Sequence, residues 1–292
     1  MKRTSPIIHI VASVIALLAT SINGIAACPY CTIESQTLTE EMASSDVVVI
    51  ARLVKAAAPV TEGPDELGEF GVVDPETGRA RFRIERVLLG EDLLLGAEEI
   101  EAVYFGEVDF EKQFFIRAVG LDRLDWNIPM PLTDVAVDYI DELENLPESG
   151  AERIAFFLNY LQHEDPLLAQ DSYDEFARAP YADVLAIAER IDRDQLWRWI
   201  EARDVSPNRR SLFFTLLGVC GGEEDRLRMR KMMLADDRVL RAAAEASAAA
   251  ALGIGGAITL PAAPEMVGME QRRKQLGFNA MVGCYLKLGG EQ

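Results

Sequence analysis

The chain of 292 residues is 49% hydrophobic and has a formal net charge of −19 at pH 7, from 48 acidic and 29 basic side chains. This apolar content is enough for a folded core and excludes global disorder. The charge excludes nucleic acid and anionic lipid as expected partners, because both are bound by clustered cations. The basic runs Arg209-Arg210 and Arg272-Arg273-Lys274 are short and isolated.

The first 27 residues have the order of a secretory signal peptide. Lys2 and Arg3 precede a mainly apolar run at 7–22, and small residues follow before Cys28. A charged start, an apolar centre and a small-residue cleavage site define such a leader. The apolar run is shorter than the roughly 20 residues that span a bilayer. We expect residues 1–27 to be removed, no transmembrane segment to remain, and the protein to be secreted or periplasmic.

The expected mature chain begins with the sequence Cys28-Pro29-Tyr30-Cys31. Export to an oxidising compartment favours a disulfide between Cys28 and Cys31. Two alternatives stay open. The run 25–28 also fits a lipobox, which would leave Cys28 lipidated and the protein anchored to the cell envelope. The four residues also match a glutaredoxin active site, although that chemistry needs a strand before the first cysteine, and cleavage would remove the residues that could form it.

From residue 28 to about 145 the pattern is mostly that of strands. It predicts a short helix at 37–43, capped by Thr37 or Thr39, and a polar loop at 61–78. The predicted strands cover 46–54, 80–87, 99–105 and 112–119, with 135–140 as a further candidate. Antiparallel strands joined by uneven loops suit a small barrel or sandwich.

From 146 to 240 the apolar residues follow a helical period instead. The predicted helices cover 151–161, 168–177, 184–191, 194–203, a segment opening at Ser206-Pro207, and 226–234. Short helices without intervening strands favour helical pairs stacked into a solenoid or bundle. We expect an Ala/Gly/Pro-rich link at 241–266 and a last helix within 267–292. The fold class is therefore α+β, with a domain boundary between 143 and 150.

Three features of the first half resemble the netrin-like module shared with tissue inhibitors of metalloproteinases. They are the early cysteine pair, the strand at Ser45–Ala51 and the later segment Phe82–Gly90. The resemblance covers about residues 28–140 and implies an OB-type barrel. The inhibitors begin with Cys-x-Cys, whereas two residues separate Cys28 from Cys31, and their later barrel cysteines are missing here.

The second half is similar to HEAT-type helical repeats, whose turn within the repeat resembles His163–Ala169. The spacing of the following helices is less regular than the 40 to 47 residues of a HEAT array. Taken whole, the chain resembles a family of secreted bacterial proteins that join these two parts. The resemblance implies no particular activity.

Few residues are candidates for catalysis or metal binding. Once the leader is removed, His163 is the only histidine, so a Ser-His-Asp or Cys-His centre would need it and a His-rich zinc site cannot be built. We expect His163 in a turn with Asp165-Pro166. The sequence contains no EF-hand loop, HExxH, P-loop or GxSxG motif. We therefore expect no catalytic residue, metal or cofactor.

Cys220 and Cys284 lie on apolar faces of predicted helices and are expected to be buried free thiols. Trp197 and Trp199 point in different directions on one helix, so one is expected in the core. The functional hypothesis, which rests on the type of fold, is a secreted non-enzymatic binding or scaffold protein with a protein partner. The alternatives are thiol-disulfide oxidoreduction at Cys28 with Cys31, and netrin-like protease inhibition through the Cys28 N-terminus.

Overall fold

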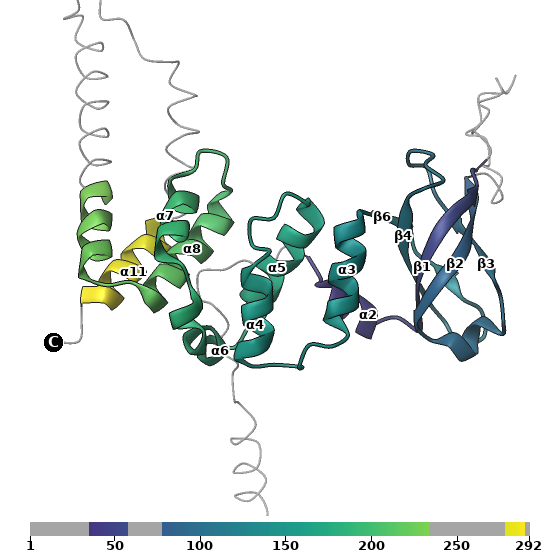
Figure 1. Ribbon diagram of the computed structural model, residues 1–292, viewed down its shortest axis with the longest axis horizontal. Coiled ribbons are helices and arrows are strands. Elements are labelled where there is room, and N and C mark those ends of the chain that lie inside the picture. The colour runs from purple at the N-terminus through teal and green to yellow at the C-terminus, as the bar shows by residue number, and fades with distance from the viewer. Residues whose placement is uncertain (1–34, 58–77, 234–277, 290–292) are drawn as a thin grey trace, which may run out of the picture. The chain divides into compact units, whose positions relative to one another are not determined.

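A computed structural model of the chain describes residues 35–57, 78–233 and 278–289. It shows a mixed α+β protein with a nearly closed antiparallel barrel-like sheet and several helices (Figure 1). The chain divides into a compact unit of residues 33–175 and a second unit that includes residues 176–292. The change from strands to helices predicted near residue 146 therefore falls inside the first unit.

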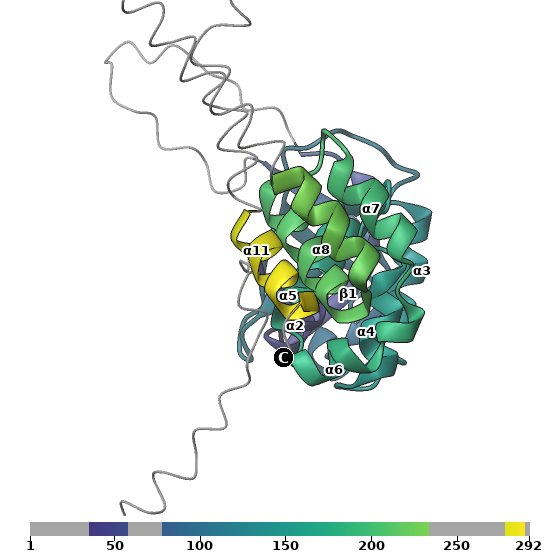
Figure 2. The ribbon, with the colours of Figure 1, turned by 90° about the vertical axis from the view of Figure 1, so that its left-hand side faces the viewer.

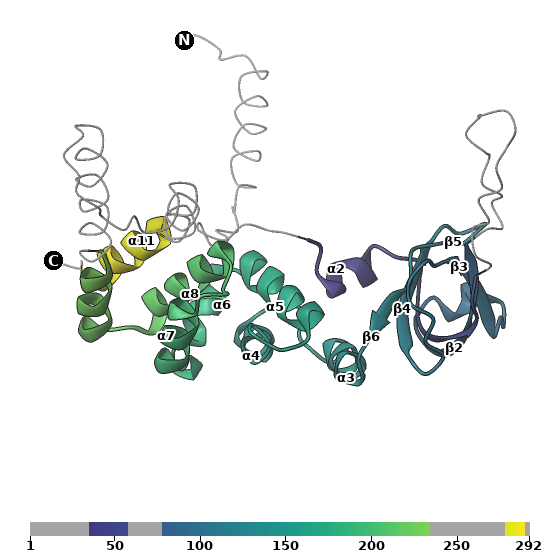
Figure 3. The same cartoon turned by 90° about the horizontal axis from the view of Figure 1, so that it is seen from above.

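The sheet has six strands, and every pair of neighbours is antiparallel. They are β1 (Val47–Lys55), β2 (Arg79–Leu89), β3 (Glu99–Val103), β4 (Gln113–Val119), β5 (Asp125–Trp126) and β6 (Met130–Leu132). The order is β3-β2-β1-β4-β5, with β6 also paired to β4. Since β4 returns to lie beside β1, the first four strands form a Greek key. Contacts between β3 and β5 nearly close the barrel, as Figure 3 shows from above.

Strand β1 is central because its sequence is apolar on both faces. Val47, Val49, Ala51 and Leu53 point into the barrel, and the alternate residues at 48 and 50 are also buried. A strand covered on both sides is expected to be rich in β-branched residues rather than alternating. The barrel core consists of Val47, Val49, Ala51, Leu53, Ala80, Phe82, Leu94, Ile100, Ala102, Phe114, Ile116 and Ala118.

The turn after β2 requires glycine. Gly90 has a φ of +79°, and a Cβ added there would lie 2.1 Å from the backbone oxygen of Asp46. Only glycine combines this left-handed conformation with so close an approach of two backbones. The chain then forms the 3-10 helix η1 (Glu91–Leu94) before β3.

The helices that begin in the first unit are α2 (Leu38–Ala43), α3 (Asp134–Leu143), α4 (Ala151–Leu158) and α5 (Pro166–Arg178). The strand expected at 135–140 is wrong, because this segment belongs to α3. The Thr133 hydroxyl caps α3 by accepting the backbone N–H of Ala136 at 3.1 Å. The buried residues of α3 recur at helical spacing: Ala136, Tyr139, Ile140 and Leu143. Val135 and Val137 favour a strand locally, but the cap at Thr133 and the helical spacing of the buried residues favour the helix.

The second unit is helical in its described part. It contains α6 (Tyr181–Ala186), the 3-10 helix η2 (Ala188–Arg190), α7 (Arg193–Glu201), α8 (Pro207–Cys220), helical residues 223–233 and α11 (Phe278–Gly289). Helix α8 packs against α7 and α11 (Figure 2). Ser206 caps α8, its hydroxyl accepting the Arg209 N–H at 3.3 Å, and Pro207 is the first helical residue, as the sequence predicts. The helices vary from six residues in α6 to 14 in α8 and do not by themselves define a repeat.

Candidate functional site

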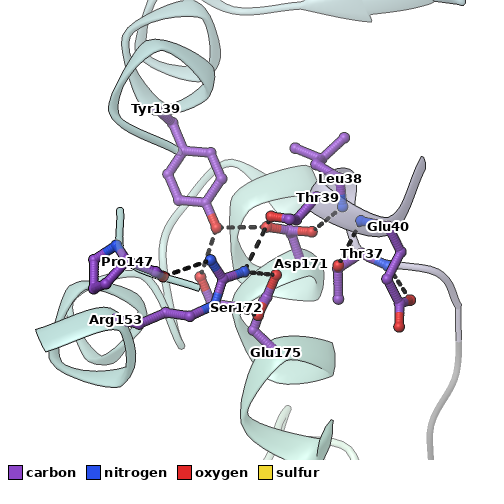
Figure 4. A network of polar contacts seen from close by, with 10 residues as sticks. All are labelled: Thr37, Leu38, Thr39, Glu40, Tyr139, Pro147, Arg153, Asp171, Ser172 and Glu175. Carbon is purple, nitrogen blue, oxygen red and sulfur yellow. Dashed lines mark hydrogen bonds and ion pairs between the residues drawn. The ribbon is translucent and has the colours of Figure 1, made fainter. Parts of the chain in front are cut away.

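The most concentrated group of buried charged residues lies on α5. Asp171, Asp174 and Glu175 are all at least 93% buried, because their exposed fractions are 4%, 0% and 7%. Their spacing of three and four residues places them along one side of the helix. Buried carboxylates need hydrogen-bonding partners, and here the partners come from α2, α3, α4 and the residues just before α2 (Figure 4).

Asp171 joins α5 to the start of α2 and to α3. One carboxylate oxygen accepts the backbone N–H of Leu38 at 2.6 Å, and the other accepts the hydroxyl of Tyr139 at 2.6 Å. Leu38 is the first residue of α2, where helix N–H groups have no partner within the helix. Asp171 therefore supplies an acceptor and a negative charge at the positive end of α2. The Tyr139 hydroxyl also lies 3.3 Å from Ser172 Oγ.

The protonation of this pair is shifted by burial. Removal from water raises the pKa of Asp171 to about 6, from 3.8, and the hydrogen bonds from Tyr139 and Leu38 offset part of this effect. Burial, followed by the nearby charge of Asp171, raises the pKa of Tyr139 far above its usual range. Tyr139 is thus a permanent hydrogen-bond donor, and it cannot serve as a base or an ionised nucleophile near neutral pH.

Arg153 of α4 and Glu175 of α5 form a buried ion pair, with the Arg153 Nη2 atom 2.6 Å from a Glu175 oxygen. The same Nη2 atom donates to the Thr39 hydroxyl at 3.1 Å, and Nη1 donates to the backbone oxygen of Pro147 at 3.3 Å. The guanidinium also lies 5.1 Å from the centre of the Phe157 ring. Arg153 therefore connects α4 with α5, with α2 and with the turn between α3 and α4.

The residues that lead into α2 are held in the same way. The Ser35 hydroxyl donates to Asp174 at 2.7 Å. Thr37 caps α2 through a reciprocal pair of hydrogen bonds with Glu40, of 3.2 and 3.1 Å, as the sequence predicts for Thr37. The segment at 35–39 is thus fastened to α5 before the chain enters β1, which explains why α3, α4 and most of α5 belong to the same compact unit as the barrel.

The arrangement is suited to holding helices together and not to acting on a substrate. Its buried charged side chains are Arg153, Asp171, Asp174 and Glu175, none more than 8% exposed, and Glu40 at the cap of α2 is half-buried. Each of the ten residues drawn in Figure 4 contacts another member of the group through a hydrogen bond or ion pair. In the part of the chain that the structure describes, no three His, Cys, Asp or Glu side chains gather as metal ligands would.

The residues singled out in the sequence lie elsewhere. Cys28 and Cys31 fall outside the described residues, as do the link at 241–266 and most of the polar loop at 61–78. His163 is in the turn between α4 and α5, as predicted, where its Nδ1 accepts the backbone N–H of Asp165 at 3.1 Å.

The two remaining cysteines are free thiols, as predicted; Cys284 is buried, whereas Cys220 is only half-buried. Burial raises the pKa of Cys220 to about 11 and that of Cys284 to about 12, so both stay neutral and unreactive at neutral pH. Trp197 is buried and donates to Asp225 at 2.7 Å, whereas Trp199 is partly exposed and lies against Phe213. The prediction of one core tryptophan is confirmed.

The buried network was not predicted from the sequence. The helix predicted at 168–177 corresponds to α5, whose Ala169, Tyr173 and Phe176 are buried. The one sequence signal for the buried network was that Asp171, Asp174 and Glu175 lie close to these apolar residues of the same helix.

Comparison with known proteins adds no relative: no family model, curated protein or solved structure matches this chain. Among the described helices, none is long and apolar enough to cross a membrane.

Proposed function

We propose that the protein is exported and acts by binding another protein, without catalysing a reaction. The observation that carries this proposal is a set of large apolar side chains exposed in the connections β3–β4, β4–β5 and β5–β6. They are each at least half exposed: Phe105, Val108, Phe110, Leu121 and Ile128. Three of the five, Phe105, Val108 and Phe110, lie in one connection. Exposed apolar surface marks interaction sites, and aromatic residues contribute most of the binding energy at such sites.

The type of barrel supports the same proposal. A partly open, five-stranded Greek-key barrel is the description of an OB-type fold, and the order β3-β2-β1-β4-β5 agrees with it. We assign the barrel to this type and, with the sequence resemblance, to the netrin-like group. The packing of α8 between α7 and α11 is in keeping with HEAT-like helical pairs. Both kinds of domain offer loops or helix faces to a partner. The fold alone does not identify which of these surfaces binds.

Export and the state of the cysteine pair form a second part of the proposal. We expect cleavage before Cys28 and a disulfide between Cys28 and Cys31 in the mature protein. Non-reducing peptide mapping of protein recovered from exporting cells should give an N-terminal peptide about two mass units lighter than its dithiol form. Two alkylatable thiols in that peptide would contradict the disulfide, an added diacylglyceryl group would show the lipid anchor instead, and a species that keeps Met1 would contradict export.

The rival functions both depend on Cys28. The sequence Cys28-Pro29-Tyr30-Cys31 favours thiol-disulfide oxidoreduction, and the netrin-like resemblance favours protease inhibition by the N-terminus.

Affinity purification of the tagged full chain from the envelope of its source cells should recover a protein that then binds the purified chain directly and saturably. Catalytic amounts of the chain should not accelerate the reduction of insulin by dithiothreitol. A Cys28→Ser, Cys31→Ser variant should behave like the unaltered chain in the binding assay. Acceleration of insulin reduction that this variant abolishes would replace the proposal with the oxidoreductase, and the lack of any saturable partner would contradict it.

A further inference from the structure

The connection between β3 and β4, residues 104–112, exposes three large apolar side chains, two of them aromatic. Phe105 is 69% exposed, Val108 52% and Phe110 50%. Apolar residues exposed singly are common on proteins. Three within six positions, two of them phenylalanine, form a local surface of the kind that binds a partner.

The backbone of this connection is held in place from the inside. The Tyr104 ring packs edge-to-face against Phe82 and Phe114, with centroid distances of 5.9 and 5.2 Å, and both partners belong to the barrel core. The Tyr104 hydroxyl donates to the backbone oxygen of Glu107 at 2.9 Å. The Asp109 carboxylate accepts the N–H of residue 111 at 2.9 Å. Because the loop is ordered before a partner arrives, binding loses less conformational entropy.

The exposed Phe105 ring is also positioned by a neighbouring strand. Gly78, just before β2, has a φ of +86°, and a Cβ added there would lie 2.4 Å from the Phe105 ring. The lack of a side chain at Gly78 therefore lets one part of the ring rest on the backbone while the remainder faces water. The backbone at Gly78 therefore restricts the position of the Phe105 ring.

The charges of the connection alternate with its apolar residues. Glu107, Asp109 and Glu111 lie between and beside Val108 and Phe110, and the Glu111 side chain is 97% exposed. Lys112 is the only cation of residues 104–112 and lies 4.0 Å from Asp109, and Arg52 of β1 lies 4.0 Å from the Glu111 carboxylate, so three carboxylates stand against two cations. The surface is therefore both apolar and anionic.

This chemistry disfavours two occupants from the same chain. The segment 58–77, which precedes Gly78 in the sequence, carries six carboxylates and no Lys or Arg, so its charge does not complement that of the connection. A second copy of the chain brings a net charge of −19 and the same anionic loop. Complementary charge both steers a partner and excludes wrong ones.

We propose that residues 104–112 form a docking surface for a segment of another protein that carries apolar and basic side chains. This inference rests on the proposed binding function and specifies the chemistry of the partner. Phe105, Val108 and Phe110 supply the apolar contact, and Glu107 and Glu111 attract the cations.

The probe for this surface is a synthetic helical peptide of 14 residues with leucine on one face and lysine on the other. Isothermal titration at low salt should show binding to the full chain, and the affinity should fall as salt is raised. A Phe105→Ser, Phe110→Ser variant should bind about tenfold or more weakly. A Glu107→Gln, Glu111→Gln variant should bind more weakly at low salt and show a smaller dependence on salt.

Three controls separate a specific surface from general attraction to an acidic protein. Peptides with glutamate in place of lysine, or serine in place of leucine, should not bind. A Leu95→Asn variant removes another exposed apolar side chain, 92% exposed in the turn after η1, and should bind the probe as the unaltered chain does. Thermal unfolding of each variant by circular dichroism should match that of the unaltered chain, since every changed side chain is at least half exposed or charged and on the surface.

The outcome also separates this inference from the proposed function. Equal binding of the probe by the unaltered chain and by Phe105→Ser, Phe110→Ser, or no binding at all, would overturn the docking surface. If the envelope partner were still captured by that variant, the binding function would stand and its site would lie elsewhere. Binding of the probe that needs Phe105 and Phe110, without any envelope partner, would support the surface and contradict the function.

Discussion

Replacement of Arg153 by methionine should lower the free energy of unfolding by about 3 to 5 kcal/mol, the usual effect of removing one partner of a buried ion pair. The variant leaves the Glu175 carboxyl group, 7% exposed, without the 2.6 Å contact to Arg153. It also removes the Arg153 N–H groups that donate to the Thr39 hydroxyl and to the Pro147 carbonyl. Urea unfolding followed by far-ultraviolet circular dichroism measures the effect.

The double variant Arg153→Met, Glu175→Leu tests the cause. Because it removes both charges and fills the site with apolar groups, it should be clearly more stable than Arg153→Met alone. Arg81 and Glu101 provide a matched exposed pair, 3.0 Å apart with side chains 44% and 48% exposed. Arg81→Met should change the stability by less than about 1 kcal/mol. If Arg153→Met had as small an effect as Arg81→Met, the network would not hold the helices together.

The strands of the barrel could be predicted because their signals are local. β1 has a run of β-branched residues, and β2 alternates between Phe82 or Ile84 inside and arginine outside. The two short strands could not be predicted, since β5 has two residues and β6 three, too few to show a period of two. Their position is fixed by pairing with β4, which is a tertiary effect.

The misassigned segment at 135–140 shows where a local pattern fails. Val135 and Val137 favour a strand, but the cap at Thr133 and the spacing of Tyr139, Ile140 and Leu143 favour a helix, and only the longer window includes the second set. The compact units are drawn on another basis than the predicted domain boundary. The boundary followed the change in periodicity, whereas the units are defined by contacts between distant residues such as Leu38 and Asp171, 133 positions apart.

The candidate site shows the same limit. The sequence places Asp171, Asp174 and Glu175 on one helix and gives Thr37 or Thr39 as the cap of another. It does not show that the carboxylate of Asp171 accepts the first N–H of that second helix. A hydrogen bond between segments far apart in the sequence produces no periodic pattern of residues. Only the folded chain brings together the acceptor and the donor.

Asp171 should make the protein more stable as the pH falls from 7 to about 4. The folded protein holds a proton on Asp171 below about pH 6, whereas the unfolded chain releases it above 3.8. Between these values folding takes up a proton, so this group's contribution to the free energy of unfolding is fully present below 3.8 and is lost as the pH rises through 6. The slope is about 1.4 kcal/mol per pH unit for a full proton, and the total is up to about 3 kcal/mol.

Asp171→Asn isolates this effect, because asparagine keeps an oxygen that can accept the Leu38 N–H but cannot titrate. The unaltered chain should gain stability relative to Asp171→Asn as the pH is lowered from 6 to 4, and the difference should be constant above about pH 7. Burial also raises the pKa of Glu41, but this group titrates in both proteins. Its contribution therefore cancels in the difference between their stabilities. Scanning calorimetry across pH 4 to 8 measures the difference, with Asp122→Asn as the control for losing one exposed negative charge. A difference that stays flat throughout, or grows as the pH rises, would mean that Asp171 is charged in the folded protein at pH 5 and that burial is not the dominant influence on its carboxyl group.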